Sequence, residues 1–133
     1  LLKSGAEEEY LKELERSRSG LMYMPIVKSM EQWEMTENYD INVAAAELIF
    51  ETLDSPLAAS DFLENLNRKG VLPWVNAITL NDRDILSGGL DDNRAIAEGF
   101  EENWGRLADM GFKIIQTDWP ALLRNFINQK YNI

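Results

Sequence analysis

The chain has 133 residues, of which 45% are apolar and 27% charged, a composition typical of one globular domain with a hydrophobic core. A formal net charge of −10 argues against nucleic acid and anionic membrane surfaces as partners, because their phosphates would repel the chain. Cysteine and histidine are absent, which excludes disulfides, thiolate nucleophiles, imidazole metal ligands and a Ser-His-Asp triad from this chain alone, and no apolar run is long enough to span a bilayer.

Three segments share a pattern in which a helix is followed by a glycine and then by an apolar strand. They are LKELERSRSGLMYMPIVK (11–28), FLENLNRKGVLPWVNAIT (62–79) and WGRLADMGFKIIQTD (104–118). We expect Gly20, Gly70 and Gly111 to end the three helices in the left-handed conformation. Basic residues before the first two glycines complement the negative helix end. The acidic stretch AEEEYLKELE (6–15) predicts a helix with a solvated face.

The remaining sequence predicts one further strand and shows where the helices before Gly70 and Gly111 begin. The run AAAELIFET (44–52) indicates a strand, and the helix after it is expected to have Ser55 as its N-cap and Pro56 at its first position. Residues 91–111 predict the helix that ends at Gly111. Its apolar stripe repeats at helical spacing and is expected to face the core rather than a ligand; its members are Ile96, Phe100, Trp104 and Leu107.

The predicted fold class is α/β, with residues 1–133 forming a single domain. The expected order begins with a helix and then alternates four strands with helices. The strands are apolar throughout rather than alternating, as in a parallel sheet that is covered by helices. Four β/α units are compatible with an open sheet and with half of an eight-stranded β/α barrel, and periodicity does not separate the two.

The longest irregular stretch, LNDRDILSGGLDDNR (80–94), contains four aspartates. They lie at positions 82, 84, 91 and 92. An oxygen-ligand cation site is one interpretation, but the spacing fits no EF-hand loop. Aspartate is also a preferred residue at helix N-caps and first turns, so we favour a solvated loop with helix caps.

Polar residues at the predicted strand ends form the candidate site, because ligands of parallel α/β proteins lie at the carboxyl ends of the strands. These residues are Lys28, Glu51, Asn76 and Asp118, the last following Thr117. Such a set suits an anionic, hydroxylated ligand, with Lys28 balancing the charge. The alternative is that Lys28 and Glu51 pair with each other. Asp118 is expected mainly to cap the last helix, with Pro120 in its first turn. Its second expected role is to line the edge of the pocket.

Two segments carry a resemblance to a known family. LPWVNAIT (72–79) and ADMGFKIIQTDWPALLRNFI (108–127) resemble the last two strands of glycerophosphodiester phosphodiesterases. The matching positions are Trp74, Val75, Asn76, Gly111, Ile115, Thr117, Asp118 and Pro120. The loop containing GGLDDNRA (88–95) resembles a bacterial subgroup with an extended connection before the last helix–strand unit.

The resemblance implies the C-terminal half of an eight-stranded β/α barrel that hydrolyses glycerophosphodiesters to glycerol phosphate and an alcohol, a reaction of lipid metabolism. The family's catalytic histidines and the Glu/Asp ligands of its divalent cation, Mg²⁺ or Ca²⁺, belong to the first half of the barrel and have no counterpart here. The resemblance therefore assigns substrate contacts alone to this chain. Trp74 would form an apolar wall and Lys28 would offset phosphate charge, beside Glu51, Asn76 and Asp118.

The partners expected from this interpretation are the missing N-terminal half of the barrel or a second copy of the chain. The first residue is Leu rather than Met, so we expect a processed or cut piece of a longer protein. Open sheet edges and apolar strand faces favour a homodimer of the isolated chain. An alternative function is a non-catalytic interaction or assembly domain derived from such a barrel. A His-Arg motif upstream would favour the enzyme.

Overall fold

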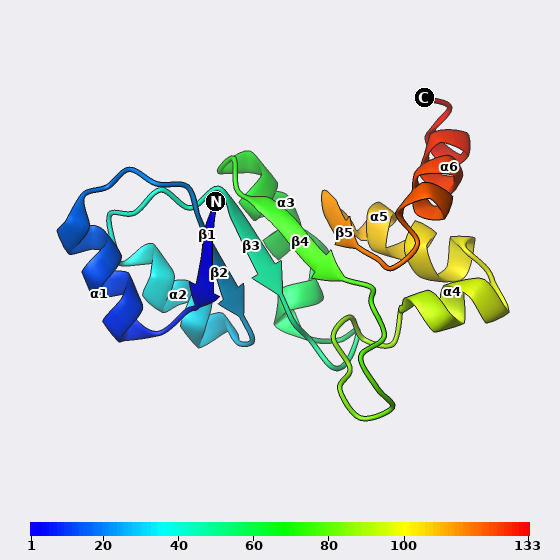
Figure 1. Cartoon of the computed structure of the whole chain (residues 1–133), viewed down its shortest axis with the longest axis horizontal. Helices are drawn as coiled ribbons and strands as arrows, with labels where there is room; N and C mark the ends of the chain where they lie inside the picture. The colour runs from blue at the N-terminus through cyan, green and yellow to red at the C-terminus, as the bar shows by residue number, and fades with distance from the viewer.

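Five parallel strands form the single sheet of the computed structural model, which describes all 133 residues (Figure 1). The strands are β1 (Leu2–Gly5), β2 (Tyr23–Val27), β3 (Ala45–Leu48), β4 (Leu72–Asn76) and β5 (Ile114–Gln116). Every neighbouring pair is parallel, and the order in the sheet follows the order in the chain. The predicted α/β class with a parallel sheet is confirmed. The prediction of four strands is wrong, because β1, the short segment Leu-Lys-Ser-Gly, carries a single apolar residue and was not recognised.

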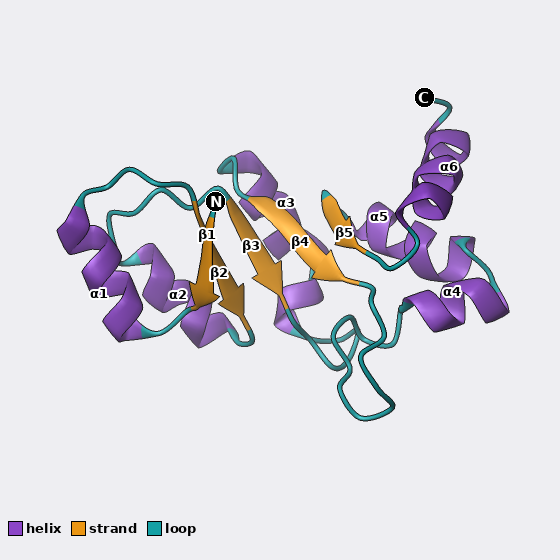
Figure 2. Ribbon diagram, in the orientation of Figure 1, coloured by secondary structure: helices purple, strands orange, loops and turns teal.

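At least one helix follows each strand, and the helices cover one face of the sheet (Figure 2). They are α1 (Glu8–Ser17), α2 (Met30–Glu37), α3 (Ser60–Arg68), α4 (Asp92–Glu98), α5 (Arg106–Met110) and α6 (Pro120–Tyr131). Right-handed crossovers place all helices on the same side when the strand order never reverses. In Figures 1 and 2 no helix lies in front of the sheet, and we call this uncovered side the open face. None of the six helices is long and apolar enough to cross a lipid bilayer.

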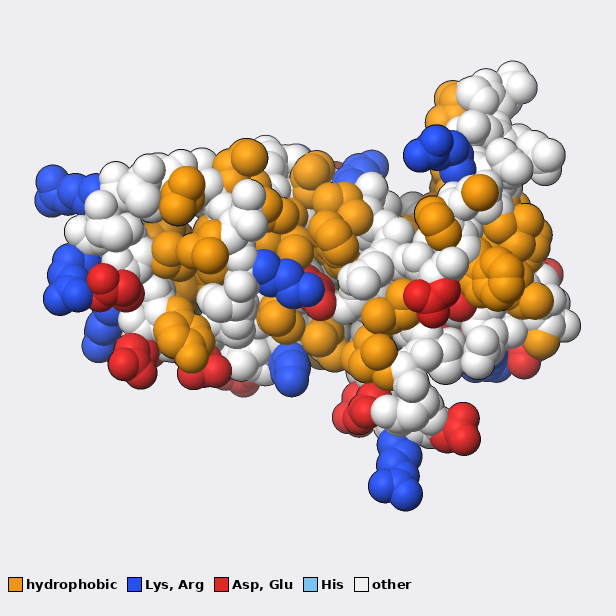
Figure 3. All heavy atoms as spheres, viewed as in Figure 1, with side chains coloured by type: hydrophobic (Ala, Val, Ile, Leu, Met, Phe, Trp, Pro, Cys, Tyr) orange, Lys and Arg blue, Asp and Glu red, His pale blue; other side chains and the backbone are white.

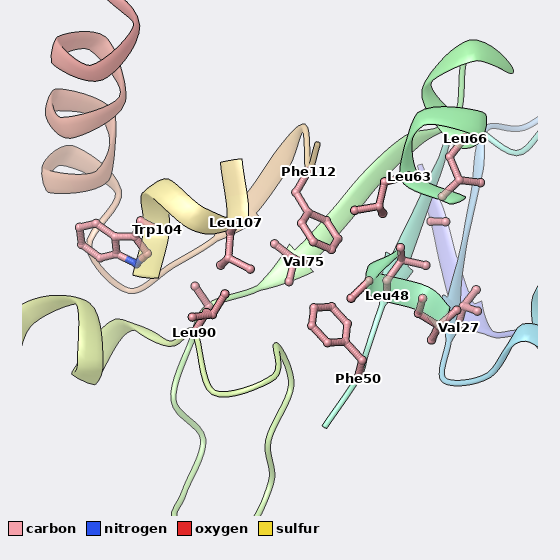
Figure 4. Packing of buried hydrophobic residues seen from close by; sticks show 14 of the residues in the cluster. Val27, Leu48, Phe50, Leu63, Leu66, Val75, Leu90, Trp104, Leu107 and Phe112 are labelled. Carbon is pink, nitrogen blue, oxygen red and sulfur yellow. The ribbon is translucent and has the colours of Figure 1, made fainter. Parts of the chain in front are cut away.

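The core lies between the helices and the covered face of the sheet (Figure 4). Val27, Leu48 and Val75 point from the three central strands toward this side and are fully buried. Burial of each apolar side chain of this size stabilises the folded state by roughly 1.5–3 kcal/mol. Because strand side chains alternate, the residues between them face the opposite way. The open face therefore receives Ile26, Glu47 and Trp74, which are register neighbours.

The helix ends follow the sequence signals in most places. Gly111 is the left-handed C-cap of α5 with φ of 113°, and Gly70, with φ of 77°, follows the C-cap of α3. Gly20 has the predicted left-handed conformation, with φ of 66°, but it does not end α1, because Arg18 is the C-cap with φ of 45°. Ser55 caps as predicted by accepting a hydrogen bond from the Leu57 N–H. The helical segment there begins as a 3₁₀ turn (Pro56–Ala58), and α3 follows.

The single helix predicted over 91–111 is interrupted at Gly99. This glycine has φ of 135°, a conformation that side chains disfavour, and it separates α4 from a π-helical segment (Glu101–Gly105) and α5. Trp104 is fully buried and stacks on Phe100 with 4.8 Å between ring centroids. The expected core position of Ile96 is wrong, because its side chain is 48% exposed on α4.

Candidate functional site

A row of polar side chains crosses the open face of the sheet. Lys3 extends from β1, Glu47 from β3, and Trp74 and Asn76 from β4. Lys3 Nζ lies 2.5 Å from Glu47 Oε2. Glu47 Oε1 accepts a hydrogen bond from Asn76 Nδ2 at 2.6 Å, and Asn76 Oδ1 accepts one from Trp74 Nε1 at 3.0 Å. The register that places Glu47 opposite Trp74 brings these residues together.

The charge of Glu47 is buried, whereas that of Lys3 is not. The side chain of Glu47 is 6% exposed and that of Lys3 is 41% exposed. Glu47 Oε2 accepts no hydrogen bond of good geometry. Its contact with Lys3 is therefore an ion pair that rests on the short distance between the two charged atoms. A buried carboxylate needs such a partner because transfer out of water strongly disfavours an isolated charge. The pair holds an ammonium group in place on the face of the sheet that no helix covers.

Asn76 and Trp74, both predicted as substrate contacts, are engaged with each other. The amide of Asn76 is buried and uses its oxygen for Trp74 and its nitrogen for Glu47. The arrangement orients the carboxylate of Glu47 rather than presenting a free amide. The half-buried indole of Trp74 uses its N–H within the row, which leaves its ring as an apolar surface.

Lys28 and Glu51, the other two predicted rim residues, line a separate cavity of about 790 Å³. It lies between the residues that follow β2 and β3 and the loop that follows β4, which contributes Arg83. Lys28 and Glu51 are exposed and form no ion pair, so the alternative in which they pair with each other does not occur here. The larger cavity, about 920 Å³ around Arg18 and Asn42, lies at the amino ends of the strands, where parallel α/β proteins seldom bind ligands.

A buried aspartate organises the corner between β5 and α6. Asp92 is 2% exposed and accepts three hydrogen bonds, each of 2.8 Å. Asp92 Oδ1 accepts hydrogen bonds from Trp104 Nε1 and Thr117 Oγ1, and Asp92 Oδ2 accepts one from the Asp118 N–H. The carboxylate therefore ties α4 and the π-helical segment to the start of α6.

The predicted cap role of Asp118 is wrong. The N-cap residue of α6 is Trp119, and no side chain caps this helix. Asp118 is exposed and uses its main-chain N–H for Asp92, while Thr117 Oγ1 accepts the Trp119 N–H at 3.0 Å. Pro120 takes the first helical position as predicted. The corner is thus held by Asp92 and Thr117.

Residues 23–127 match the model of a family described as a domain of unknown function, DUF4996. The chain belongs to the DUF4996 family. The DUF4996 match begins at β2 and ends within α6, so it includes Glu47, Asn76 and Asp92, whereas Lys3 on β1 precedes it. No curated protein matches the chain.

The DUF4996 chain does not provide a ligand set for a metal ion. No group of three or more Asp, Glu, His or Cys side chains is placed to hold one. The aspartates of the loop before α4 have other contacts, since Asp91 caps α4 through the Arg94 N–H and Asp84 accepts a hydrogen bond from Asn81. The divalent cation that the family resemblance implies therefore has no matching site among these residues.

Sequence reasoning missed Lys3, Glu47 and Asp92. Glu47 carries a visible signal, since it is the one charged residue within the apolar run AAAELIF (44–50) of a strand predicted to be buried. A charge in such a strand needs a partner. Nothing in the sequence marks Lys3 as a site residue, because its strand, β1, has a single apolar residue and no strand pattern. Asp92 resembles an ordinary first-turn residue, and its burial depends on Trp104 and Thr117, which are distant in the sequence.

Replacement of Asp118 with Ala is expected to change the free energy of unfolding by less than about 0.5 kcal/mol, as for surface positions without specific contacts. Thr117→Ala removes two hydrogen bonds and is expected to lower it by about 1–2 kcal/mol. Urea unfolding of both variants measures the difference. A larger loss for Asp118→Ala than for Thr117→Ala would contradict this view of the corner.

Proposed function

We propose that the chain forms the C-terminal part of a β/α barrel that hydrolyses glycerophosphodiesters to glycerol phosphate and an alcohol. The observation that carries the proposal is the ammonium group of Lys3, which the buried Glu47 holds on the open face of the sheet. The resemblance of β4 and of the β5–α6 corner to the last two strands of glycerophosphodiester phosphodiesterases supplies the reaction.

The strand order supports a barrel rather than a doubly wound open sheet. In doubly wound sheets the order reverses, and helices cover both faces. Here the order β1-β2-β3-β4-β5 never reverses, and one face has no helices. A barrel covers this face with its own opposite strands. Because five strands are present rather than four, about three further β/α units would complete an eight-stranded barrel.

The proposed roles follow from the geometry of the row. Lys3 contacts a phosphate oxygen, because the exposed part of its ammonium group remains available while Glu47 fixes its position. The ring of Trp74 forms an apolar wall beside it. Lys28 provides a second positive charge at the rim of the sheet. Asn76 acts indirectly, by orienting Glu47.

The remaining chemistry requires groups from outside this chain. In the proposed reaction a divalent cation, Mg²⁺ or Ca²⁺, would polarise the phosphoryl oxygens when bound. Neither its ligands nor a histidine for acid–base catalysis is present among these residues. The chain's own contribution is to position the phosphate and exclude water from one side of it.

The proposal predicts activity for the longer protein and none for the isolated chain. A protein that includes the preceding barrel units should hydrolyse a glycerophosphodiester in the presence of Mg²⁺ or Ca²⁺, and the 133-residue chain should not turn it over with either metal. The double variant Lys3→Met/Glu47→Gln of the longer protein is expected to lose about 100-fold in kcat/KM, as for loss of one preorganised contact. The matched control Lys113→Met alters an exposed lysine away from the row.

Absence of metal-dependent hydrolysis by the longer protein would remove this proposal. Hydrolysis by the isolated chain, with contaminating enzymes excluded, would instead show that the acid–base groups lie within these residues. An unchanged kcat/KM in the double variant would remove the assigned role of Lys3.

A non-catalytic interaction or assembly domain is the second candidate, favoured by the apolar side chains on the open face. Leu72 is 44% exposed there, and Ile26 and Ile114 are half-buried. Exposed apolar groups of this kind mark surfaces that bind other proteins. A His-Arg motif and Glu-x-Asp ligands in the sequence upstream would favour the enzyme, and their absence would favour the interaction domain.

A further inference from the structure

An apolar groove of about 760 Å³ lies between β5, α5 and α6. Phe112, Ile115, Leu123 and Ile127 form its apolar walls, and Arg124 lies at its rim. Figure 3 shows the hollow between the projecting α6 and the body of the molecule, with hydrophobic side chains on both sides. We call this feature the β5–α6 groove.

The β5–α6 groove borders a free edge of the sheet. β5 pairs with β4 alone, and β1 pairs with β2 alone. Figure 1 shows α6 beyond β5, on the side away from β4. A strand added to β5 would therefore lie beneath α6, and every second side chain of that strand would enter the groove.

We propose that the β5–α6 groove binds β1 of a second copy of the chain. β1 is the other free edge of the sheet, so pairing it with β5 of another copy keeps all strands parallel. Its apolar residue Leu2 is 43% exposed and alternates with Lys3, which faces the open side. Leu2 therefore faces the helices and fits the apolar walls of the groove.

The charges beside the two surfaces are complementary. Glu7 and Glu9 follow β1, are exposed and form no ion pair within the chain. In a parallel pairing they come next to the amino end of α6, where the helix dipole is positive and Arg124 forms no ion pair. This match favours β1 over a segment of unrelated sequence.

The same contact made twice closes the dimer. β1 of each copy pairs with β5 of the other around a two-fold axis, so the five strands of each copy join into one continuous parallel sheet. No edge then remains unpaired, and the open faces are enclosed. The inference concerns the isolated chain and does not depend on the proposed phosphodiesterase activity.

Light scattering coupled to gel filtration, over a dilution series from about 100 to 1 μM, tests the proposal (a span that covers typical micromolar affinities). We expect a species of twice the 15.2 kDa chain mass, which dissociates on dilution. Leu2→Lys and Arg124→Glu should each weaken association at least tenfold. Combining Arg124→Glu with Glu7→Lys and Glu9→Lys should restore it. Ile96→Glu, which alters an exposed residue outside the groove, is the matched control and should change nothing.

Circular dichroism of each variant shows that it remains folded. A wild-type chain that stays monomeric at about 100 μM would overturn the proposal (binding at that level corresponds to less than about 6 kcal/mol). A dimer that resists Leu2→Lys and Arg124→Glu but dissociates with Leu72→Lys would also overturn it, because the open faces would then associate directly. Because the chain contains no cysteine, a disulfide between Leu2→Cys and Lys113→Cys chains mixed together would report the proposed pairing.

Discussion

Replacement of Asp92 with Ala is expected to lower the free energy of unfolding by about 3–5 kcal/mol, because three hydrogen bonds to one buried carboxylate are lost together. The substitution removes three hydrogen bonds to a carboxylate that is 2% exposed. Hydrogen bonds to a charged group contribute more than neutral ones, and the fully buried Trp104 N–H would be left without an acceptor. The whole free energy of unfolding of a small domain is about 5–15 kcal/mol, so this loss is a large share of it.

Urea unfolding followed by tryptophan fluorescence measures the effect, with two variants for comparison. Asp91→Ala removes an N-cap hydrogen bond at the neighbouring position and is expected to lower the stability by about 0.5–2 kcal/mol. Asp92→Asn keeps one acceptor oxygen but turns an amide toward the Asp118 N–H, so an intermediate loss is expected. A loss below about 1 kcal/mol for Asp92→Ala would mean that water replaces the carboxylate at the corner.

Asp92 also explains why the β5–α6 corner has its sequence. Thr117 and Asp118 bind a carboxylate that lies 25 and 26 residues earlier in the chain. The corner therefore depends on the loop after β4, which carries Asp92 to it. Residues at the carboxyl ends of two neighbouring strands are thereby held in one arrangement, as a site at this edge requires.

The elements of the fold were largely predictable, because each has a local cause. Apolar runs produced β2 to β5, and the glycines that adopt positive φ, such as Gly70 and Gly111, mark the helix ends. β1 was not predictable in this way. Its four residues gain their stability from pairing with β2, and the hydrogen bond between Ser4 Oγ and the Tyr23 hydroxyl adds to it. Such contacts leave no periodic pattern in the sequence.

The site was less predictable, because it depends on strand register. Residues just beyond each strand, such as Lys28 and Glu51, were correctly expected near the carboxyl edge, where they line one cavity. The connected polar row instead arises within the strands. A shift of one residue would turn Glu47 toward the core, so its contact with Asn76 follows from the pairing of β3 with β4. That pairing is a tertiary property.

A second large effect is expected at the ion pair of Lys3 and Glu47. Lys3→Met leaves a carboxylate that is 94% buried without a counter-charge, since its side chain is 6% exposed. Removal of one partner of a buried pair typically costs about 3–5 kcal/mol, and the partial exposure of Lys3 places the expected loss near 3 kcal/mol. Glu47→Gln should cost less, because its amide oxygen still accepts the Asn76 N–H and Lys3 can turn to solvent.

The double variant Lys3→Met/Glu47→Gln separates a structural role from a functional one. Removing both charges is expected to restore most of the stability that Lys3→Met loses, because buried ion pairs contribute little beyond neutral groups of similar volume. Urea unfolding of the wild type, both single variants and the double variant gives the coupling energy. If the double variant is less stable than Lys3→Met, the ion pair stabilises the sheet, and this structural role alone accounts for its presence. If stability is restored, folding does not require the buried charge, as the phosphate contact proposed for Lys3 would allow.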